Sequence, residues 1–202
     1  MRILSFSLKI MLLALLPMLT FVACDDDPET ATISGTITIE NTELWNTWKD
    51  SGEVQVVLFG EYDLDPFPGS GWGDVPDGYY GANIPGGRFA LGAPFNAQNP
   101  VILNIVPGQS TYNYEIEVDP GTYSALAVGF RHDFVNDPTR KTATLGVHWN
   151  NPNTVSTGIV LRPFVGGNPI INDPAPTAIT VQAGDELDID FKADFAVVEY
   201  WY

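Results

Sequence analysis

The chain has 202 residues, and its 25 acidic residues outnumber the 9 basic ones, so its net charge at neutral pH is −16. This acidity argues against binding of nucleic acid or of anionic lipid headgroups, because both need clusters of Lys and Arg. A single Cys excludes an internal disulfide, and the abundance of Gly (19) and Pro (16) is typical of strands joined by turns.

The first 23 residues have the pattern of a secretory signal peptide. Arg2 and Lys9 precede residues 10–23 (IMLLALLPMLTFVA), which are almost wholly apolar. This run is too short to span a hydrocarbon core of ~30 Å comfortably. We therefore expect residues 1–23 to be cleaved rather than kept as a membrane helix.

The only cysteine, Cys24, directly follows the apolar run. Residues 21–24 (FVAC) resemble the bacterial lipobox, in which a small residue precedes a cysteine that is acylated before cleavage; the usual Leu is replaced here by Phe21. The resemblance implies attachment of lipid (palmitate) at Cys24, so that the partner through this anchor is a membrane. It also implies an outer membrane lipoprotein of the cell envelope, with the surface-exposed and the periplasmic face as the two alternatives. The alternative is an ordinary signal peptide followed by a free thiol.

Residues 24–31 (CDDDPETA) form an acidic tether without apolar side chains. They resemble the acidic export signal that follows the acylated cysteine in surface lipoproteins of Bacteroidota-type envelopes. The alternative is a solvated spacer.

From Thr32 onward, apolar residues recur with a period of two, which indicates strands. The first two expected strands are residues 32–40 and 53–62, separated by a short helical turn within residues 42–50. A strand at 112–118 leads into a type II turn at 119–122, in which Gly121 takes the positive φ. Residues 123–130 (YSALAVGF) are apolar or small at nearly every position, which predicts a central strand buried on both faces.

The remaining expected strands are 142–149, 155–161 and a hairpin of 179–183 with 187–191. The fold class is therefore all-β: an antiparallel β-sandwich of seven or more strands, forming a single domain over residues 32–202. A long Gly/Pro/aromatic loop insertion interrupts it.

Four segments resemble the carboxypeptidase regulatory-like domains of the transthyretin-like (prealbumin-like) β-sandwich class. They are residues 33–37 (ISGTI), the strand 54–58 (VQVVL), residues 118–123 (VDPGTY) and the closing stretch 181–191. In that family the tyrosine of the P-G-x-Y hairpin, here Tyr123, packs on the core. The resemblance carries no catalytic residue.

The inserted loop, residues 63–99, is rich in Gly and Pro and also bears many aromatic side chains. Long loops in compact domains are usually functional or disordered, and disordered linkers lack aromatic residues. One interpretation is a platform for a glycan or an envelope protein, with candidate ligand-binding residues Trp72, Asp74, Asp77, Tyr79 and Tyr80. The other is that the aromatic residues cover an open end of the sandwich.

We expect no cofactor, although calcium is an alternative because the loop carries the oxygen ligands Asp63, Asp65, Asp74 and Asp77. His132 and His148 are too few for a zinc site, and Ser70 lacks the G-x-S-x-G context of a nucleophile. We therefore expect no catalytic residues.

The sequence thus predicts a lipid-anchored cell-envelope protein whose β-sandwich is a non-catalytic binding or structural module. One alternative is a carbohydrate-active or other hydrolytic enzyme that uses acidic residues of the 63–99 loop. Another is an assembly subunit that pairs with its neighbour through an edge strand.

Overall fold

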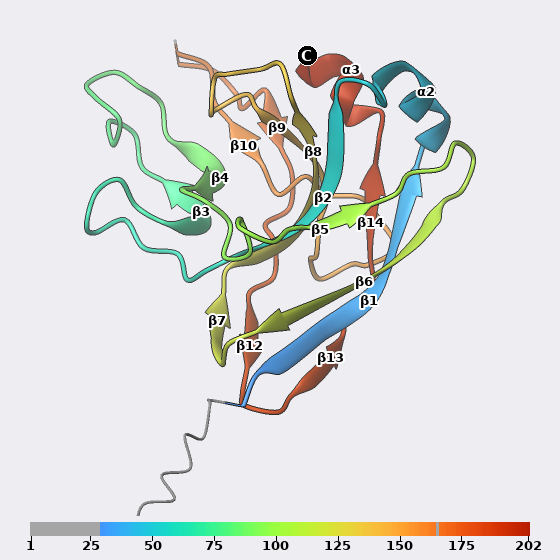
Figure 1. Cartoon of the computed structure of the whole chain (residues 1–202). Helices are drawn as coiled ribbons and strands as arrows, with labels where there is room; N and C mark the ends of the chain where they lie inside the picture. The colour runs from blue at the N-terminus through green and yellow to red at the C-terminus, as the bar shows by residue number, and fades with distance from the viewer. Residues whose placement is uncertain (1–28, 165) are drawn as a thin grey trace, which may run out of the picture.

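The computed structural model describes residues 29–164 and 166–202. The predicted signal peptide, Cys24 and residues 24–28 of the tether lie outside this part of the chain. The described residues form an all-β, sandwich-like fold of three four-stranded sheets and one two-stranded pair (Figure 1). None of their helices is long and apolar enough to cross a membrane.

The first sheet, called here the β1 sheet, is built around β1 (Ala31–Glu40). β6 (Thr111–Val118) pairs with one side of β1 in antiparallel register. β13 (Glu186–Asp188) and β14 (Phe191–Asp194) follow each other along the other side in parallel register. The sheet is therefore mixed rather than purely antiparallel as predicted.

The predicted hairpin of 179–183 with 187–191 is wrong. β12 (Ile179–Val181) pairs instead with β7 (Gly121–Tyr123). After the turn at Gly184, the carbonyl of Asp185 accepts a hydrogen bond from the amide of Thr32 (2.8 Å), so the chain joins β1 rather than returning along β12. Alternation indicates which side chains face the core, but it does not specify the partner strand.

The turn before β7 also differs from the prediction. Gly121 does not have a positive φ, so residues 119–122 do not form a type II turn, and Gly121 already belongs to β7. Tyr123 is buried in the core, and its hydroxyl donates a hydrogen bond to the carbonyl of Asp119 (2.7 Å).

The second sheet, the β8 sheet, has the order β5 (Val101–Leu103), β2 (Gly52–Phe59), β8 (Ala125–His132), β9 (Thr142–Val147). β8 is central, as its apolar sequence predicts. The expected helical turn between the first two strands is present as a 3-10 turn, η1 (Thr42–Leu44), followed by α2 (Trp45–Trp48). A last short helix, α3 (Val197–Trp201), lies at the same end of the molecule as α2 (Figure 1).

The third sheet, the β4 sheet, corrects the prediction of a loop over residues 63–99. β3 (Gly71–Val75) and β4 (Gly87–Leu91) lie inside that segment and pair as antiparallel neighbours. β10 (Val160–Leu161) and β11 (Ile171–Asn172) complete this sheet. The strand expected over 155–161 is therefore reduced to its last two residues.

Two hydrophobic clusters lie on the two faces of the β8 sheet. Even-numbered side chains of β2 and β8, such as Val56 and Val128, pack against the β1 sheet. Odd-numbered ones, such as Val57 and Ala127, pack against Trp72 of β3 and Ile159. The β8 sheet is thus the middle of three layers, which explains why β8 is apolar on both faces.

Candidate functional site

Trp72 is one of the side chains that connect the 63–99 segment to the rest of the protein. This side chain is only 5% exposed and contacts Phe59 edge to face, with ring centroids 5.3 Å apart. Its indole Nε1 donates a hydrogen bond to the carbonyl of Gly158 (3.1 Å). Trp72 therefore follows the second of the two interpretations, in which the aromatic residues cover the sandwich, because its ring is part of the second hydrophobic cluster.

Four aromatic rings follow one another on the part of this segment that projects away from the β8 sheet (Figure 1); three of them lie in turns and the fourth, Phe89, lies on β4. Phe67 contacts Tyr79 at a centroid distance of 5.6 Å, Tyr79 contacts Tyr80 at 5.0 Å, and Tyr80 stacks on Phe89 at 6.2 Å with an interplanar angle of 20°. We call these four residues the aromatic row.

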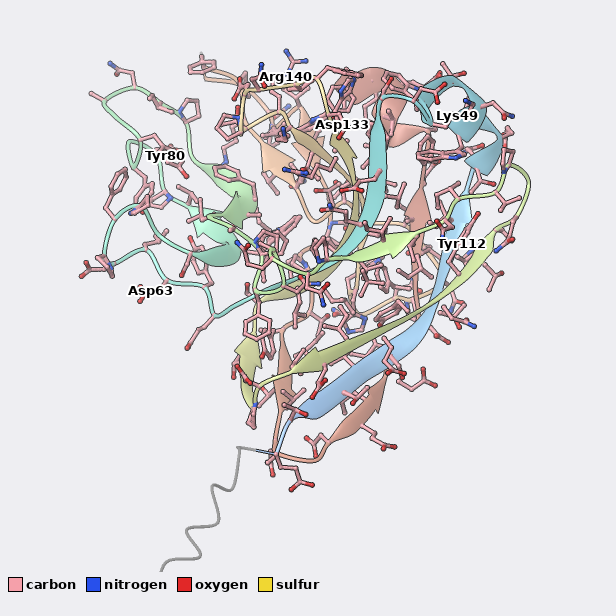
Figure 2. The ribbon with its side chains drawn as sticks, in the orientation of Figure 1. Lys49, Asp63, Tyr80, Tyr112, Asp133 and Arg140 are labelled. Atoms are coloured by element: carbon pink, nitrogen blue, oxygen red, sulfur yellow. The ribbon has the colours of Figure 1, made fainter. Side chains whose placement is uncertain are left out.

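Two members of the aromatic row are open to solvent. Phe67 is 68% exposed and Tyr80 is 44% exposed, whereas Tyr79 and Phe89 are partly buried between them and the hairpin. Figure 2 shows Tyr80 and Asp63 on this projecting part, away from the β1 sheet. The hydroxyl of Tyr79 donates to the carbonyl of Leu64 (3.3 Å), which connects the two arms of the segment.

The predicted acidic contacts Asp74 and Asp77 lie on the same 63–99 segment, and each is paired with an arginine. Asp74 forms an ion pair with Arg88 (3.1 Å), its neighbour across the β3–β4 register. Asp77 accepts a hydrogen bond from the amide of Gly86 (2.7 Å) and forms an ion pair with Arg162 (3.2 Å). The amide of Gly86, followed by the charge of Arg162, lowers the pKa of Asp77, so this carboxylate stays ionised at neutral pH.

The four carboxylates proposed for calcium do not converge. Asp63 accepts a hydrogen bond from the amide of Asp65 (2.9 Å), while Asp74 and Asp77 point to their arginines. Residues 29–164 and 166–202 contain no group of three or more His, Cys, Asp or Glu side chains placed to hold a metal ion. Calcium binding therefore stays a prediction without a preformed ligand set in this region.

Two pockets among the described residues have volumes of about 270 and 290 Å³, and neither is lined by Asp63, Asp65, Asp74 or Asp77. A hydrolytic site would need two carboxylates flanking a groove. Neither of these two pockets provides that arrangement for the four acids.

The two histidines are separate. His132 packs edge to face against Tyr202 at 4.7 Å, and its Nδ1 accepts a hydrogen bond from the amide of Phe134 (3.2 Å). His148 lies after β9, and its Nδ1 is buried without a hydrogen-bond partner among the described residues. Burial lowers the pKa of His148, so its ring is neutral at pH 7.

The sequence did not single out Phe67, Phe89, Arg88 or Arg162 as site residues. Their positions depend on the β3–β4 register and on the pairing of β4 with β10, both of which join residues distant in sequence. The alternation within residues 71–75 (GWGDV) could have indicated that Trp72 and Asp74 lie on the same face of a strand. It could not have indicated that Trp72 packs into the core or that Asp74 forms an ion pair with Arg88.

Comparisons with protein-family models, with curated proteins and with solved structures returned no match to this chain. Any function of this chain therefore rests on its sequence and on the geometry of the site.

Proposed function

We propose that this chain is a lipid-anchored protein of the bacterial cell envelope, and that its β domain is a non-catalytic module that binds a glycan through the aromatic row. The anchor is supported by the sequence pattern that ends at Cys24. Residues 25–30 alone separate this cysteine from Ala31, the first residue of β1. The lipid would hold the domain close to the membrane at this end of β1.

The surface around the start of β1 is acidic. Thr30 donates a hydrogen bond to Glu117 (2.6 Å), and Thr32 is the register partner of Glu186. Further acids at this end are Glu29, Asp119 and Asp185. Anionic headgroups repel such a surface, so the tethered domain would stand off the bilayer rather than lie flat on it. Its sides then stay accessible to a ligand.

The observation that carries the binding proposal is the aromatic row. Exposed aromatic rings present large, rigid apolar faces, and the carbon-bound faces of sugar rings can stack on them. The paired carboxylates Asp74 and Asp77 remain largely exposed, at 70% and 74% of their side-chain surface, and can accept hydrogen bonds from hydroxyl groups. Apolar surface combined with a few fixed polar groups is typical of ligand sites.

The anchor is tested by cell fractionation of a Cys24→Ala variant. Because acyl chains contribute about 0.8 kcal/mol for each buried CH₂, their loss should move the protein out of the membrane fraction. Membrane-bound Cys24→Ala protein would contradict the anchor, and it would leave the binding proposal to be judged separately.

Binding is tested by applying the full-length protein in detergent to an array of bacterial and host polysaccharides. We expect binding to at least one glycan, weakened about 10-fold or more by Tyr80→Ala, since loss of one stacked ring removes roughly 1.4 kcal/mol. The control is Phe134→Ala, which removes an even more exposed ring (73%, against 44% for Tyr80) from the loop between β8 and β9. An array without binding, or equal losses in both variants, would contradict the proposal.

A further inference from the structure

The β1 and β8 sheets are joined closely along one side and open along the other. Along the closed side β14 packs against β9: a Cβ atom at Gly146 would collide with the carbonyl of Lys192, so only glycine permits this approach. Along the open side β5 and β6 meet at the 104–110 connection and diverge away from it (Figure 1). A groove of about 290 Å³ lies between them.

One wall of this groove belongs to β6 and the other to β5 and the turn before it. Glu115, Ile116 and Glu117 line the first wall. The second wall is made of Val101 together with Phe95, Asn96, Gln98 and Asn99. Phe95 is 44% exposed, so the rim of the second wall carries an apolar ring.

The turn that forms the second wall is fixed to β2. The side chain of Asn96 accepts a hydrogen bond from the amide of Leu58 (3.0 Å) and donates one to the carbonyl of Val56 (3.1 Å). The amide of Phe95 also donates to the carbonyl of Leu58 (2.6 Å). The groove is therefore preformed, and a ligand would not have to order its wall.

The wall made by β6 is a free strand edge. The amide of Ile39 donates to the carbonyl of Ser110 (2.7 Å), and in the antiparallel register this places the even-numbered residues of β6 in hydrogen bonds with β1. The amides and carbonyls of Asn113, Glu115 and Glu117 then point outward, and within the described residues they have no backbone partner. Such an edge can accept another strand.

The charge of the edge selects the kind of strand. Glu115 and Glu117 are exposed on β6, and no basic side chain lines the groove. A second copy of this chain would bring its own glutamates to the pair, and like charges opposite each other are unfavourable. We infer that the groove binds an extended segment of a partner protein in which basic residues alternate with apolar ones. The basic residues would face the two glutamates, and the apolar residues would face Ile116 and Val101.

The test uses the full-length protein and a defined probe, an acetylated peptide of alternating Val and Lys residues, in isothermal titration calorimetry. Two control peptides replace every Lys by Glu or carry N-methyl groups on alternate amides, which block strand pairing. The test variant is Glu115→Gln/Glu117→Gln on β6. Its matched control, Glu186→Gln/Asp188→Asn, removes the same charge from exposed residues of β13, on the opposite side of β1.

We expect the Val-Lys peptide to bind and both control peptides to fail. The Glu115→Gln/Glu117→Gln variant should bind about 10-fold more weakly, because two cross-strand charge pairs contribute roughly 1.4 kcal/mol together. The β13 variant should change the affinity less than about 2-fold. No binding of the Val-Lys peptide, equal binding of the N-methylated peptide, or equal losses in the two variants would each overturn the inference.

Discussion

At the scale of single residues, two buried side chains are the most informative. Trp72 was a candidate ligand-binding residue, with cover for the sandwich as the alternative; it is buried, and its indole nitrogen donates to a backbone carbonyl. His148 is polar, but its Nδ1 is buried and has no hydrogen-bond partner among the described residues. Trp72 attaches the β3–β4 hairpin to the second hydrophobic cluster. His148 should make the stability of the domain depend on pH.

Protonation of His148 should destabilise the fold below its ordinary pKa. Burial lowers the pKa of this ring from 6.5, so as the pH falls the unfolded chain binds a proton before the folded chain does. His148→Phe keeps an aromatic ring and removes this titration. The free energy of unfolding, measured by urea denaturation, should therefore fall more steeply for the wild-type protein than for the variant below pH 6.5.

The linkage between proton binding and folding limits how strongly His148 can change the free energy of unfolding with pH. One group can contribute a slope of at most about 1.4 kcal/mol for each pH unit, and the contribution ends below the folded-state pKa. Between about pH 7.5 and about pH 9 the difference between the two proteins should be constant. Parallel curves for the two proteins from pH 8 to about pH 5 would contradict the neutral, buried state of His148.

At the scale of secondary-structure elements, a close backbone contact explains how the last strand joins the first. Gly35 of β1 has a φ of +152°, and a Cβ atom there would collide with the carbonyl of Ile189. The same carbonyl accepts a hydrogen bond from the hydroxyl of Tyr114 (2.7 Å), and the amide of Ile189 donates to Ser34 (2.8 Å). The break between β13 and β14 is thus held against β1 from both sides.

Gly35→Ala should therefore be strongly destabilising. Collision with backbone and an unfavourable φ together should lower the free energy of unfolding by roughly 3 kcal/mol or more, as measured by urea denaturation. Gly121→Ala is the matched control, since no atom lies within 4 Å of its added Cβ and its φ is not positive. Its effect should stay within about 0.5 kcal/mol. Similar stabilities for the two variants would contradict the close approach of β1 and Ile189.

The sequence could predict where several strands lie, but not which strands pair with one another. The alternation of Ile33, Ile37 and Ile39 located β1, and the apolar run of β8 indicated its central position. The parallel partners of β1 could not be inferred, because they lie about 150 positions away and alternation carries no information on pairing. β3 was missed because its sequence, GWGDV, resembles a loop in composition.

The candidate site was predictable only in part for the same reason. Tyr79, Tyr80, Asp74 and Asp77 were selected by composition, and the structure places all four on the projecting part of the hairpin. The contributions of Phe67 and Phe89 required the hairpin itself. They become neighbours of the two tyrosines only when β3 and β4 pair.

At the scale of the whole molecule, the three layers separate the end that would be anchored from the surface proposed to bind a ligand. The predicted anchor precedes β1, whose acidic surroundings disfavour contact with lipid, and the aromatic row projects from the opposite face of the β8 sheet. The middle sheet is packed on both faces, so it fixes the hairpin relative to the tethered end. A ligand bound by the row would thus be held at a defined side of the domain.

Glycan recognition by the aromatic row is tested most directly by hydroxyl-radical footprinting of the full-length protein, with and without the glycan that the array identifies. Oxidation of Phe67 and Tyr80 should fall when the glycan binds, while oxidation of Phe134 and Tyr200, which are exposed elsewhere, should not change. Protection confined to Phe134 or Tyr200, with Phe67 and Tyr80 oxidised as before, would contradict recognition by the aromatic row.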